Sequence, residues 1–189
     1  MIEIRWHGRG GQGAKTIALL FADAALQQGK HIQAFPEYGP ERMGAPVAAF
    51  NRISDKPIRL HCGVTDPQVV VILDPTLIGV VNVIMGLDPK TGTIVVNTPK
   101  LPGEIKKELK FSGKVFTIDA MKIAIDCIGK PIPNMPMLGA MVKATGVLQI
   151  EPMVEEVKSK IKDKFKHKPE VIEGNLKAVR RSFEEVKAE

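Results

Sequence analysis

Three continuous apolar runs, each followed by sequence that suits a helix, limit most strongly what this chain can fold into. They are Gln68–Asp74, Gly92–Thr98 and Lys114–Asp119. Strands that are apolar on both faces are typical of a parallel sheet covered by helices on each side. Such strands are joined through right-handed helical crossovers. The pattern therefore predicts an α/β fold: a three-layer sandwich with a mainly parallel sheet and a helical C-terminal segment.

The other expected elements follow from periodicity and from glycine and proline. From Ala14 to Gln28 the apolar residues recur at helical spacing, and Gly29 is placed to cap that helix. The remaining N-terminal elements are strands at Ile2–Gly8, His31–Phe35 and Ala45–Ser54, and a helix that begins near Pro75.

Beyond Pro133 the sequence predicts helices, at Asn134–Gly146, Glu151–Lys166 and Pro169–Lys187. The last has one apolar face, made of Val171, Ile172, Leu176, Val179, Phe183 and Val186. The methionine-rich stretch Ile132–Val142 is either core at helical spacing or an adaptable subunit interface. Because no linker, repeat or low-complexity tract interrupts the chain, we expect a single domain over residues 1–189.

Composition and charge narrow the function classes. The chain is 44% hydrophobic and 25% charged, and no apolar run approaches the ~18 residues that a membrane helix needs. No charged leader with a cleavage site precedes Ile2, so we expect a cytoplasmic protein without a membrane partner. The net charge of +6 suits an acidic ligand, but aromatic residues are only 5%. The lysines of Lys158–Pro169 scatter around a helix, so nucleic acid is not an expected partner.

Few residues offer redox or catalytic chemistry. Cys62 and Cys127 lack a CxxC or cysteine–histidine spacing, so we expect small buried apolar residues that ligate neither zinc nor an iron–sulfur cluster. None of the four histidines has a nucleophile or a metal-spaced neighbour in the sequence. His7 precedes a glycine loop, where it either binds a ligand or is structural at a strand end. We predict no catalytic residue and no metal site.

That glycine loop offers a phosphate site. Gly8, Gly10 and Gly13 fit GxGxxG between a strand and a helix, the arrangement that binds dinucleotides in Rossmann folds. Glycine lets the backbone approach a phosphate, and free amides at the next helix N-terminus attract an anion. Glu37 follows the second strand where a ribose-binding acid would lie, although prolines surround it. These features favour NAD.

Two alternatives remain open. A P-loop requires GxxxxGK[ST], but here Ala14 separates Gly13 from Lys15. One extra residue turns the lysine by about 100° around the helix, away from a triphosphate. The other alternative is a tight strand-to-helix turn that binds nothing.

A second loop, Ala34–Ile58, completes a pattern that is recognisable as a whole. Prolines and glycines at high density fix its shape around Glu41 and Arg42. The sequence resembles gamma subunits of the 2-oxoacid:ferredoxin oxidoreductase family, most closely those of enzymes that act on pyruvate. The resemblance runs through nearly the whole chain, in the stretches HGRGGQGAKT, QAFPEYGPERMGAPVAAFNRISDKPIR, VVVILDPTLI and NMPMLGAMVKATG.

The resemblance implies an activity that belongs to a complex. Enzymes of the family convert a 2-oxoacid, coenzyme A and oxidised ferredoxin to acyl-CoA, carbon dioxide and reduced ferredoxin, or run in reverse. Thiamine diphosphate, magnesium and [4Fe-4S] clusters lie in the alpha, beta and delta subunits, and ferredoxin accepts the electrons. A gamma subunit carries none of these groups, so the isolated chain is expected to be inactive. The family fold is a three-layer α/β domain.

The resemblance also suggests a role for the two loops. Coenzyme A carries a pyrophosphate and a 3′-phosphate, which suit a glycine loop with cations nearby. The stretch Glu41–Asp55 favours pyruvate as the substrate, with branched-chain 2-oxoacids next. The competing hypothesis is a free-standing NAD-binding oxidoreductase domain. The candidate cofactor-binding residues are Gly8, Arg9, Gly10, Gly11, Gln12, Gly13, Lys15, Glu41 and Arg42.

Overall fold

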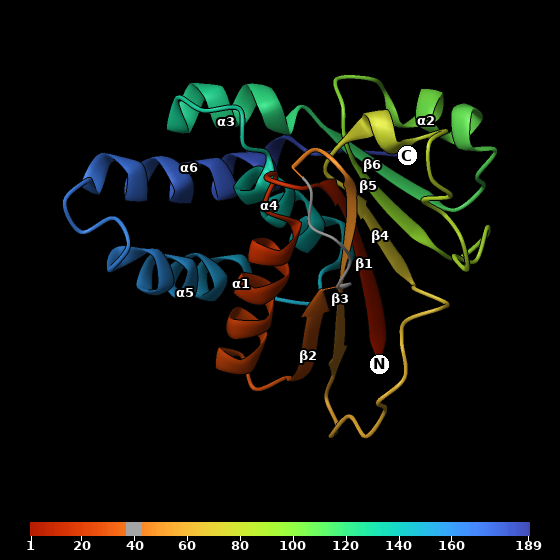
Figure 1. Ribbon diagram of the computed structural model, residues 1–189, viewed down its shortest axis with the longest axis horizontal. Coiled ribbons are helices and arrows are strands. Elements are labelled where there is room, and N and C mark those ends of the chain that lie inside the picture. The colour runs from red at the N-terminus through yellow and green to blue at the C-terminus, as the bar shows by residue number, and fades with distance from the viewer. Residues whose placement is uncertain (37–42) are drawn as a thin grey trace.

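The centre of the fold is a mixed sheet. The structure is a computed structural model that describes residues 1–36 and 43–189. Within them seven strands follow the order β2-β3-β1-β4-β5-β6-β7 (Figure 1). The β1–β4, β4–β5 and β5–β6 pairs are parallel, whereas β1–β3, β2–β3 and β6–β7 are antiparallel. The strands are β1 (Ile2–Arg9), β2 (His31–Pro36), β3 (Pro46–Ser54), β4 (Val69–Ile72), β5 (Thr93–Asn97), β6 (Lys114–Ile118) and β7 (Lys187–Ala188).

Helices pack on one face of this sheet over the larger hydrophobic core (Figure 1). Ile4 and Trp6 of β1 point into that core, and the Trp6 Nε1 donates to Asn51 Oδ1 at 2.7 Å. The helices on this face are α1 (Ala14–Gln27), α3 (Ala120–Ile128), α4 (Asn134–Thr145), α5 (Ile150–Lys162) and α6 (Pro169–Glu185). The helical C-terminal segment is therefore confirmed, and Met135, Met137 and Met141 of α4 are buried in the core.

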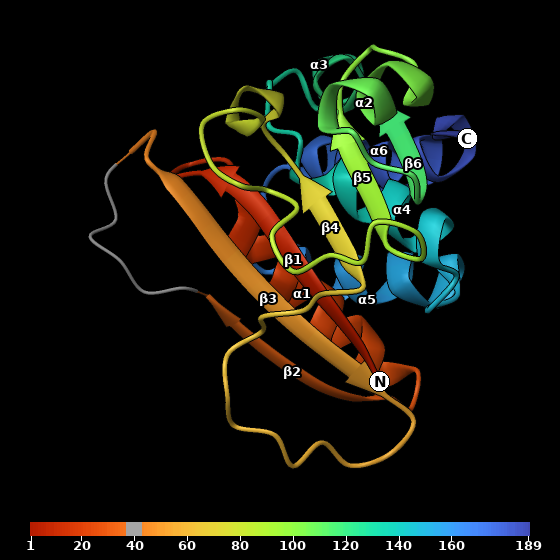
Figure 2. The ribbon, with the colours of Figure 1, turned by 90° about the vertical axis from the view of Figure 1, so that its right-hand side faces the viewer.

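The opposite face is covered in two different ways. Over β4, β5 and β6 a second core holds apolar side chains of these strands together with Leu77, Val83, Leu87, and Ile105 of α2 (Pro102–Leu109). Over β1 and β3 no helix lies in the described part of the chain, and residues 55–68 cross that face instead (Figure 2). The predicted α/β sandwich is confirmed, with its third layer formed by α2 and loops.

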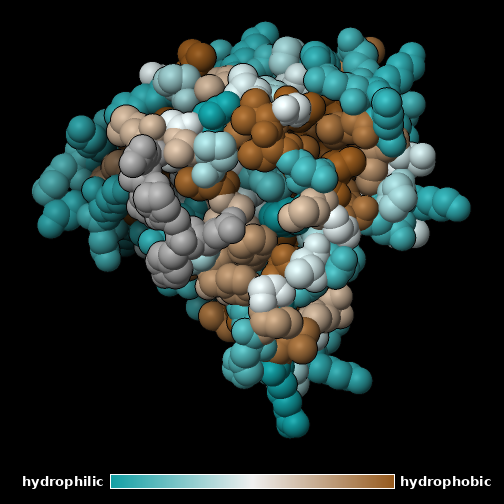
Figure 3. All heavy atoms as spheres, turned by 45° about the vertical axis from the view of Figure 1, so that its right-hand side comes forward, coloured by the Kyte–Doolittle hydropathy of each residue, from teal (hydrophilic) through white to brown (hydrophobic). Residues whose placement is uncertain are grey.

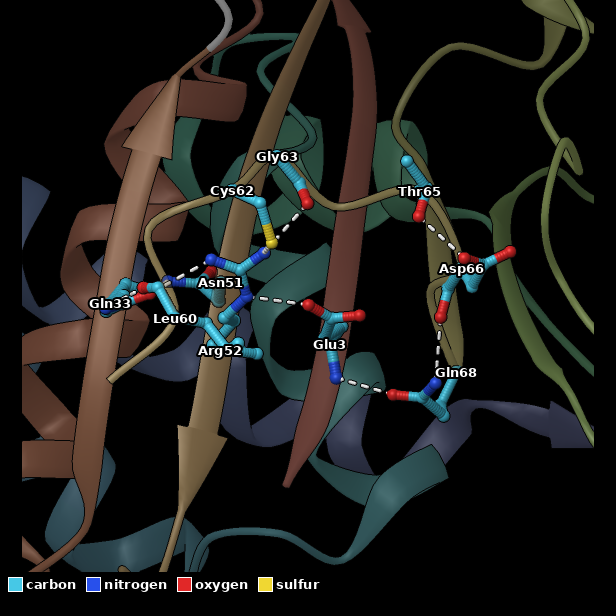
Figure 4. Close-up of polar contacts among 10 residues, drawn as sticks. All are labelled: Glu3, Gln33, Asn51, Arg52, Leu60, Cys62, Gly63, Thr65, Asp66 and Gln68. Atoms are coloured by element: carbon cyan, nitrogen blue, oxygen red, sulfur yellow. Dashed lines mark hydrogen bonds and ion pairs between the residues drawn. The ribbon is translucent and has the colours of Figure 1, made fainter. Parts of the chain in front are cut away.

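The Arg52 side chain links residues 55–68 to the polar face of β1 and β3 through hydrogen bonds and an ion pair (Figure 4). Its side chain is 1% exposed and pairs with Glu3, with Nε 2.6 Å from Oε1. The Nη1 donates to Gln33 Oε1 at 3.1 Å, and Nη2 donates to Gly63 O at 2.9 Å and to Cys62 Sγ at 3.7 Å. A buried guanidinium is stable only when paired and hydrogen-bonded, which this set of acceptors provides.

The prediction of a helix that begins near Pro75 is wrong. Only the single 3₁₀ turn η1 (Pro75–Leu77) forms there, with Asp74 as its cap. Gly79, at a φ of 86°, turns the chain, and the following residues pack as irregular loop over the second core. The sequence also missed β7: the last predicted helix ends at Glu185, and Lys187 pairs with Thr117 of β6.

Candidate functional site

The glycine loop, residues 8–13, joins the end of β1 to the start of α1. Gly11 and Gly13 have φ values of 95° and 84°, which only glycine adopts without penalty. Gly13 is the N-cap of α1 without a side-chain cap, and a Cβ there would lie 2.7 Å from Asn134 Nδ2. The backbone conformation therefore favours glycine at this position, and any larger residue would also have to displace the Asn134 side chain of α4.

The loop presents the amides of the first turn of α1. The first hydrogen bond within the helix runs from Ile17 N–H to Gly13 O at 3.0 Å. The amides of Ala14, Lys15 and Thr16 precede it, and the fully described first turn contains no acidic residue. Because such amides carry partial positive charge along the helix axis, this end of α1 attracts an anion.

Asp74 holds the loop from the neighbouring strand. It follows β4, the parallel neighbour of β1, so the carboxyl ends of both strands meet here. Its Oδ2 accepts from Gln12 Nε2 at 2.7 Å and lies 3.2 Å from Arg9 Nε. Its Oδ1 accepts from Thr76 N at 2.9 Å and from Thr76 Oγ1 at 2.7 Å.

Arg9 is fixed by three segments at once. Its Nε and Nη2 donate to Thr76 Oγ1 at 3.2 and 2.9 Å, and its Nη1 donates to Gly44 O at 3.1 Å. Its backbone N–H donates to Gln12 Oε1 at 2.8 Å. A guanidinium has five N–H donors, and within residues 1–36 and 43–189 two of those on Arg9 have no acceptor. The cation is thus oriented while donors remain for a ligand.

The second loop meets the first through its backbone. Gly10 N–H donates to Ala45 O at 2.9 Å, and Gly44 N–H donates to Gly10 O at 3.1 Å. The two loops therefore lie side by side at Gly10 and Gly44–Ala45. The candidates Glu41 and Arg42, and the ribose candidate Glu37, lie outside the described residues.

A hollow of about 520 Å³ lies between the two loops. Of the candidate residues, Arg9, Gly10, Gly11, Gly13 and Lys15 line it, and Pro36 and Val47 line its other side. Ligand pockets commonly measure about 300–1,000 Å³, so the hollow has room for a phosphate-bearing group. Gly8 and Gln12 are not part of the described lining. A Cβ at Gly8 would lie 3.4 Å from Ala14 Cβ, which is an ordinary contact distance.

The pKa shifts of two groups near the loop, Asp74 and His7, favour the charge state that each ordinarily has at neutral pH. Burial acts to raise the pKa of Asp74, but hydrogen bonds from Thr76 and Gln12 and the charge of Arg9 outweigh it and lower the pKa. Burial, then the charge of Arg5, lowers the pKa of His7 to about 4, against a backbone hydrogen bond with Val83. His7 Nε2 accepts from Arg5 Nε at 3.0 Å, so His7 is a neutral structural residue.

Sequence reasoning missed Asp74, Thr76 and Asn134 as parts of the site. A local signal existed for Asp74, because Asp-Pro-Thr directly after a buried strand has the form of an N-cap followed by proline at the first helical position. No feature of the neighbouring sequence placed Asn134 of α4 beside Gly13.

The cysteine prediction is wrong for Cys62. Cys127 is partly buried and packs against the main core, whereas Cys62 is exposed on the segment that Arg52 holds. Both are free thiols. Among the described residues, no group of three or more His, Cys, Asp or Glu side chains is placed to hold a metal ion. No described helix is long and apolar enough to cross a membrane.

Comparison with known proteins identifies the family. The family model described as pyruvate ferredoxin/flavodoxin oxidoreductase matches residues 3–185. The pyruvate/ketoisovalerate oxidoreductases common subunit gamma of Thermococcus litoralis is 50% identical over 97% of this chain and 96% of its own length. A crystal structure of pyruvate oxidoreductase subunit PORC from Thermotoga maritima has a TM-score of 0.85 and 44% identity, over 99% of this chain and 97% of that one.

A more distant structure shares the fold alone. It is a 2-oxoglutarate:ferredoxin oxidoreductase from Magnetococcus marinus with 2-oxoglutarate, coenzyme A and succinyl-CoA bound. It has a TM-score of 0.71 and 20% identity, and this chain matches 30% of its length. The match of the family model over residues 3–185, with close relatives of equal length, confirms the resemblance seen in the sequence: the chain belongs to the pyruvate ferredoxin/flavodoxin oxidoreductase family.

Proposed function

We propose that this chain is the single-domain gamma subunit of a cytoplasmic pyruvate:ferredoxin oxidoreductase and that its glycine loop helps to form the coenzyme A site. The complex converts pyruvate, coenzyme A and oxidised ferredoxin to acetyl-CoA, carbon dioxide and reduced ferredoxin. Thiamine diphosphate, magnesium and [4Fe-4S] clusters belong to the alpha, beta and delta subunits. The isolated chain is inactive in this proposal.

The observation that carries the coenzyme A role is the chemistry of the hollow. The first turn of α1 and Arg9, whose guanidinium is held in place, line it, and Lys15 belongs to that first turn. Helix N-termini and arginine forks both favour phosphate groups. Coenzyme A carries a pyrophosphate and a 3′-phosphate, so its adenylate end matches the hollow in charge.

Exposed apolar side chains support a role inside a complex. Met43, Val80 and Met85 are 94%, 63% and 61% exposed. Figure 3 shows apolar atoms gathered over one face, with hydrophilic atoms toward its outer edge. Apolar patches of this kind mark protein interfaces, and Met43 also lines the hollow. We assign the exposed apolar side chains to contacts with the partner subunits.

The name of one relative bears on the choice of oxoacid. The Thermococcus litoralis protein is a common subunit of pyruvate and ketoisovalerate oxidoreductases. A gamma subunit that serves two enzymes does not itself select the oxoacid. Pyruvate remains the preferred substrate of the proposed complex. We assign the discrimination between pyruvate and larger 2-oxoacids to the partner subunits.

The strand order does not favour the competing NAD-binding function. In the Rossmann fold the second strand lies beside the first and parallel to it, which brings the ribose-binding acid near the glycine loop. Here β3 lies between β1 and β2 and is antiparallel to both. β2 is therefore separated from β1 by one antiparallel strand, which differs from the Rossmann order, although its last residue, Pro36, still lines the hollow.

Gly11→Val in the assembled complex tests the coenzyme A role. A Cβ at Gly11 would meet no atom within 4 Å, so the valine projects into open space beside the loop amides. We expect the KM for coenzyme A to rise about tenfold or more, which corresponds to the loss of one or two charge-assisted hydrogen bonds. Decarboxylation of pyruvate without coenzyme A should continue at the wild-type rate.

Gly29→Val is the matched control. Gly29 also has a positive φ, of 74°, and open space around its Cβ position, but it lies at the other end of α1. Backbone strain is therefore similar in both variants. A loss of decarboxylation and coenzyme A dependence together in Gly11→Val, or an equal effect in Gly29→Val, means that the loop is architectural.

A further inference from the structure

The carboxylate of Asp74 links the glycine loop to η1. It bonds to Gln12 and Arg9 of the glycine loop and to Thr76 of η1. Through Arg9, which donates to Gly44 O, it also reaches the second loop. Asp74 is only 9% exposed and is absent from the described lining of the hollow. It therefore acts on the site through other residues.

The hydrogen-bond pattern around Asp74 depends on its being an ionised acid. All its described partners donate: Gln12 Nε2 and Arg9 Nε face Oδ2, and the Thr76 amide and hydroxyl face Oδ1. An asparagine could still accept from Thr76, but its amide nitrogen would then face two donors. Gln12 would have to turn, and Arg9 would lose its counter-charge.

Gln12 transmits the change to the loop backbone. Its Oε1 accepts the Arg9 backbone N–H at 2.8 Å while its Nε2 is held by Asp74. The side-chain amide of Gln12 is thus held through both its oxygen and its nitrogen. If the bond to Asp74 is lost, the amide can rotate and the bond to the Arg9 backbone is lost as well. The segment between Arg9 and Gly13, most of which lines the hollow, would lose this side-chain support.

We propose that Asp74 is a positioning residue for coenzyme A: it never touches the ligand, but it sets the orientation of Arg9 and of the loop that receive the phosphates. This inference rests on the proposed coenzyme A role. It predicts a defect in binding the phosphate-bearing end of the ligand, with the chemistry of the oxoacid unaffected.

Asp74→Asn in the assembled complex tests the proposal, with two binding readouts. The first is the KM for coenzyme A. The second is the inhibition constant of adenosine 3′,5′-bisphosphate, which has phosphates of the adenylate end and no thiol. We expect both to rise about tenfold. The kcat at saturating coenzyme A and the rate of decarboxylation without coenzyme A should stay within about twofold, because Asp74 only positions binding groups.

Two further variants, one weaker and one a control, accompany Asp74→Asn. Thr76→Val leaves the carboxylate in place but removes the hydroxyl that accepts from Arg9 Nε and Nη2, so it should raise both constants less than Asp74→Asn. Asp88→Asn is the control: that carboxylate, like Asp74, accepts from backbone N–H groups after it in the chain, here those of Lys90 and Thr91. It precedes β5 and so lies at the opposite edge of the sheet, and its replacement should change neither constant.

The outcomes separate this inference from the function on which it rests. If Gly11→Val raises the KM for coenzyme A and Asp74→Asn does not, the positioning role falls and the coenzyme A site stands. If neither variant changes the KM, both proposals fall. A lowered kcat with unchanged binding constants in Asp74→Asn would also overturn the positioning role, because it indicates a fold or assembly defect.

Discussion

Some residues of the candidate site could be predicted from the sequence around them, and others could not. The glycine spacing and the following helix were sufficient to predict the loop, because positive φ at Gly11 and Gly13 is a local property of the chain. Asp74 could not be placed against Gln12 from the sequence, because the two lie 62 residues apart. Their contact depends on β1 and β4 being neighbours, which only the folded sheet decides.

His7 provides a residue-scale prediction about stability. Its pKa is about 4 in the folded chain against 6.5 as the ordinary value. Between these values the unfolded chain binds more protons, so the free energy of unfolding falls as the pH drops from about 6.5 to about 4. The full loss from this group is about 3 kcal/mol.

His7→Gln should remove this part of the pH dependence, because glutamine does not titrate. Urea unfolding of the isolated chain near neutral pH and near pH 4.5 measures the difference, with the exposed His61→Gln as the control. Equal pH dependence in wild type and His7→Gln would show that His7 is not held neutral by the fold.

At the scale of elements, the sequence predicted which segments are strands and helices better than how they pair. The buried runs that became β4, β5 and β6 are apolar on both faces, and this marked them as central parallel strands. No comparable signal placed β3 antiparallel between β1 and β2, with Ile2 opposite Ile53. The short β7 was missed because two residues pair only when β6 is already present.

The contact between α4 and α6 gives an element-scale prediction. A Cβ on Gly139 of α4 would overlap Val179 O and Ser182 Oγ of α6. Gly139→Ala should therefore force the helices apart and lower the free energy of unfolding by about 2 kcal/mol, although alanine normally stabilises a helix. Denaturant unfolding measures the change.

Gly103→Ala in α2 is the control for this prediction. There the new Cβ meets only the far end of the Glu189 side chain, with Oε2 at 2.6 Å, and that side chain can move. It should be neutral or slightly stabilising. If Gly139→Ala is as well tolerated as Gly103→Ala, the close approach of α4 and α6 is not required.

At the scale of the whole molecule, the candidate binding groups gather at one edge of the sheet. The glycine loop, Asp74 and the end of the second loop meet at the carboxyl ends of β1 and β4. The exposed Met85 lies in the loop between Val83 and Leu87, which pack in the second core. This arrangement fits a chain that contributes one wall of a site and leaves the reaction centre to its partners.

Purification of the tagged chain from its own cells, followed by analysis of what accompanies it, tests this central claim most directly. We predict a stable complex that contains thiamine diphosphate and iron–sulfur clusters in other subunits and oxidises pyruvate only when coenzyme A and ferredoxin are supplied. A chain that elutes alone and binds NADH would contradict the claim and favour the dinucleotide-binding function.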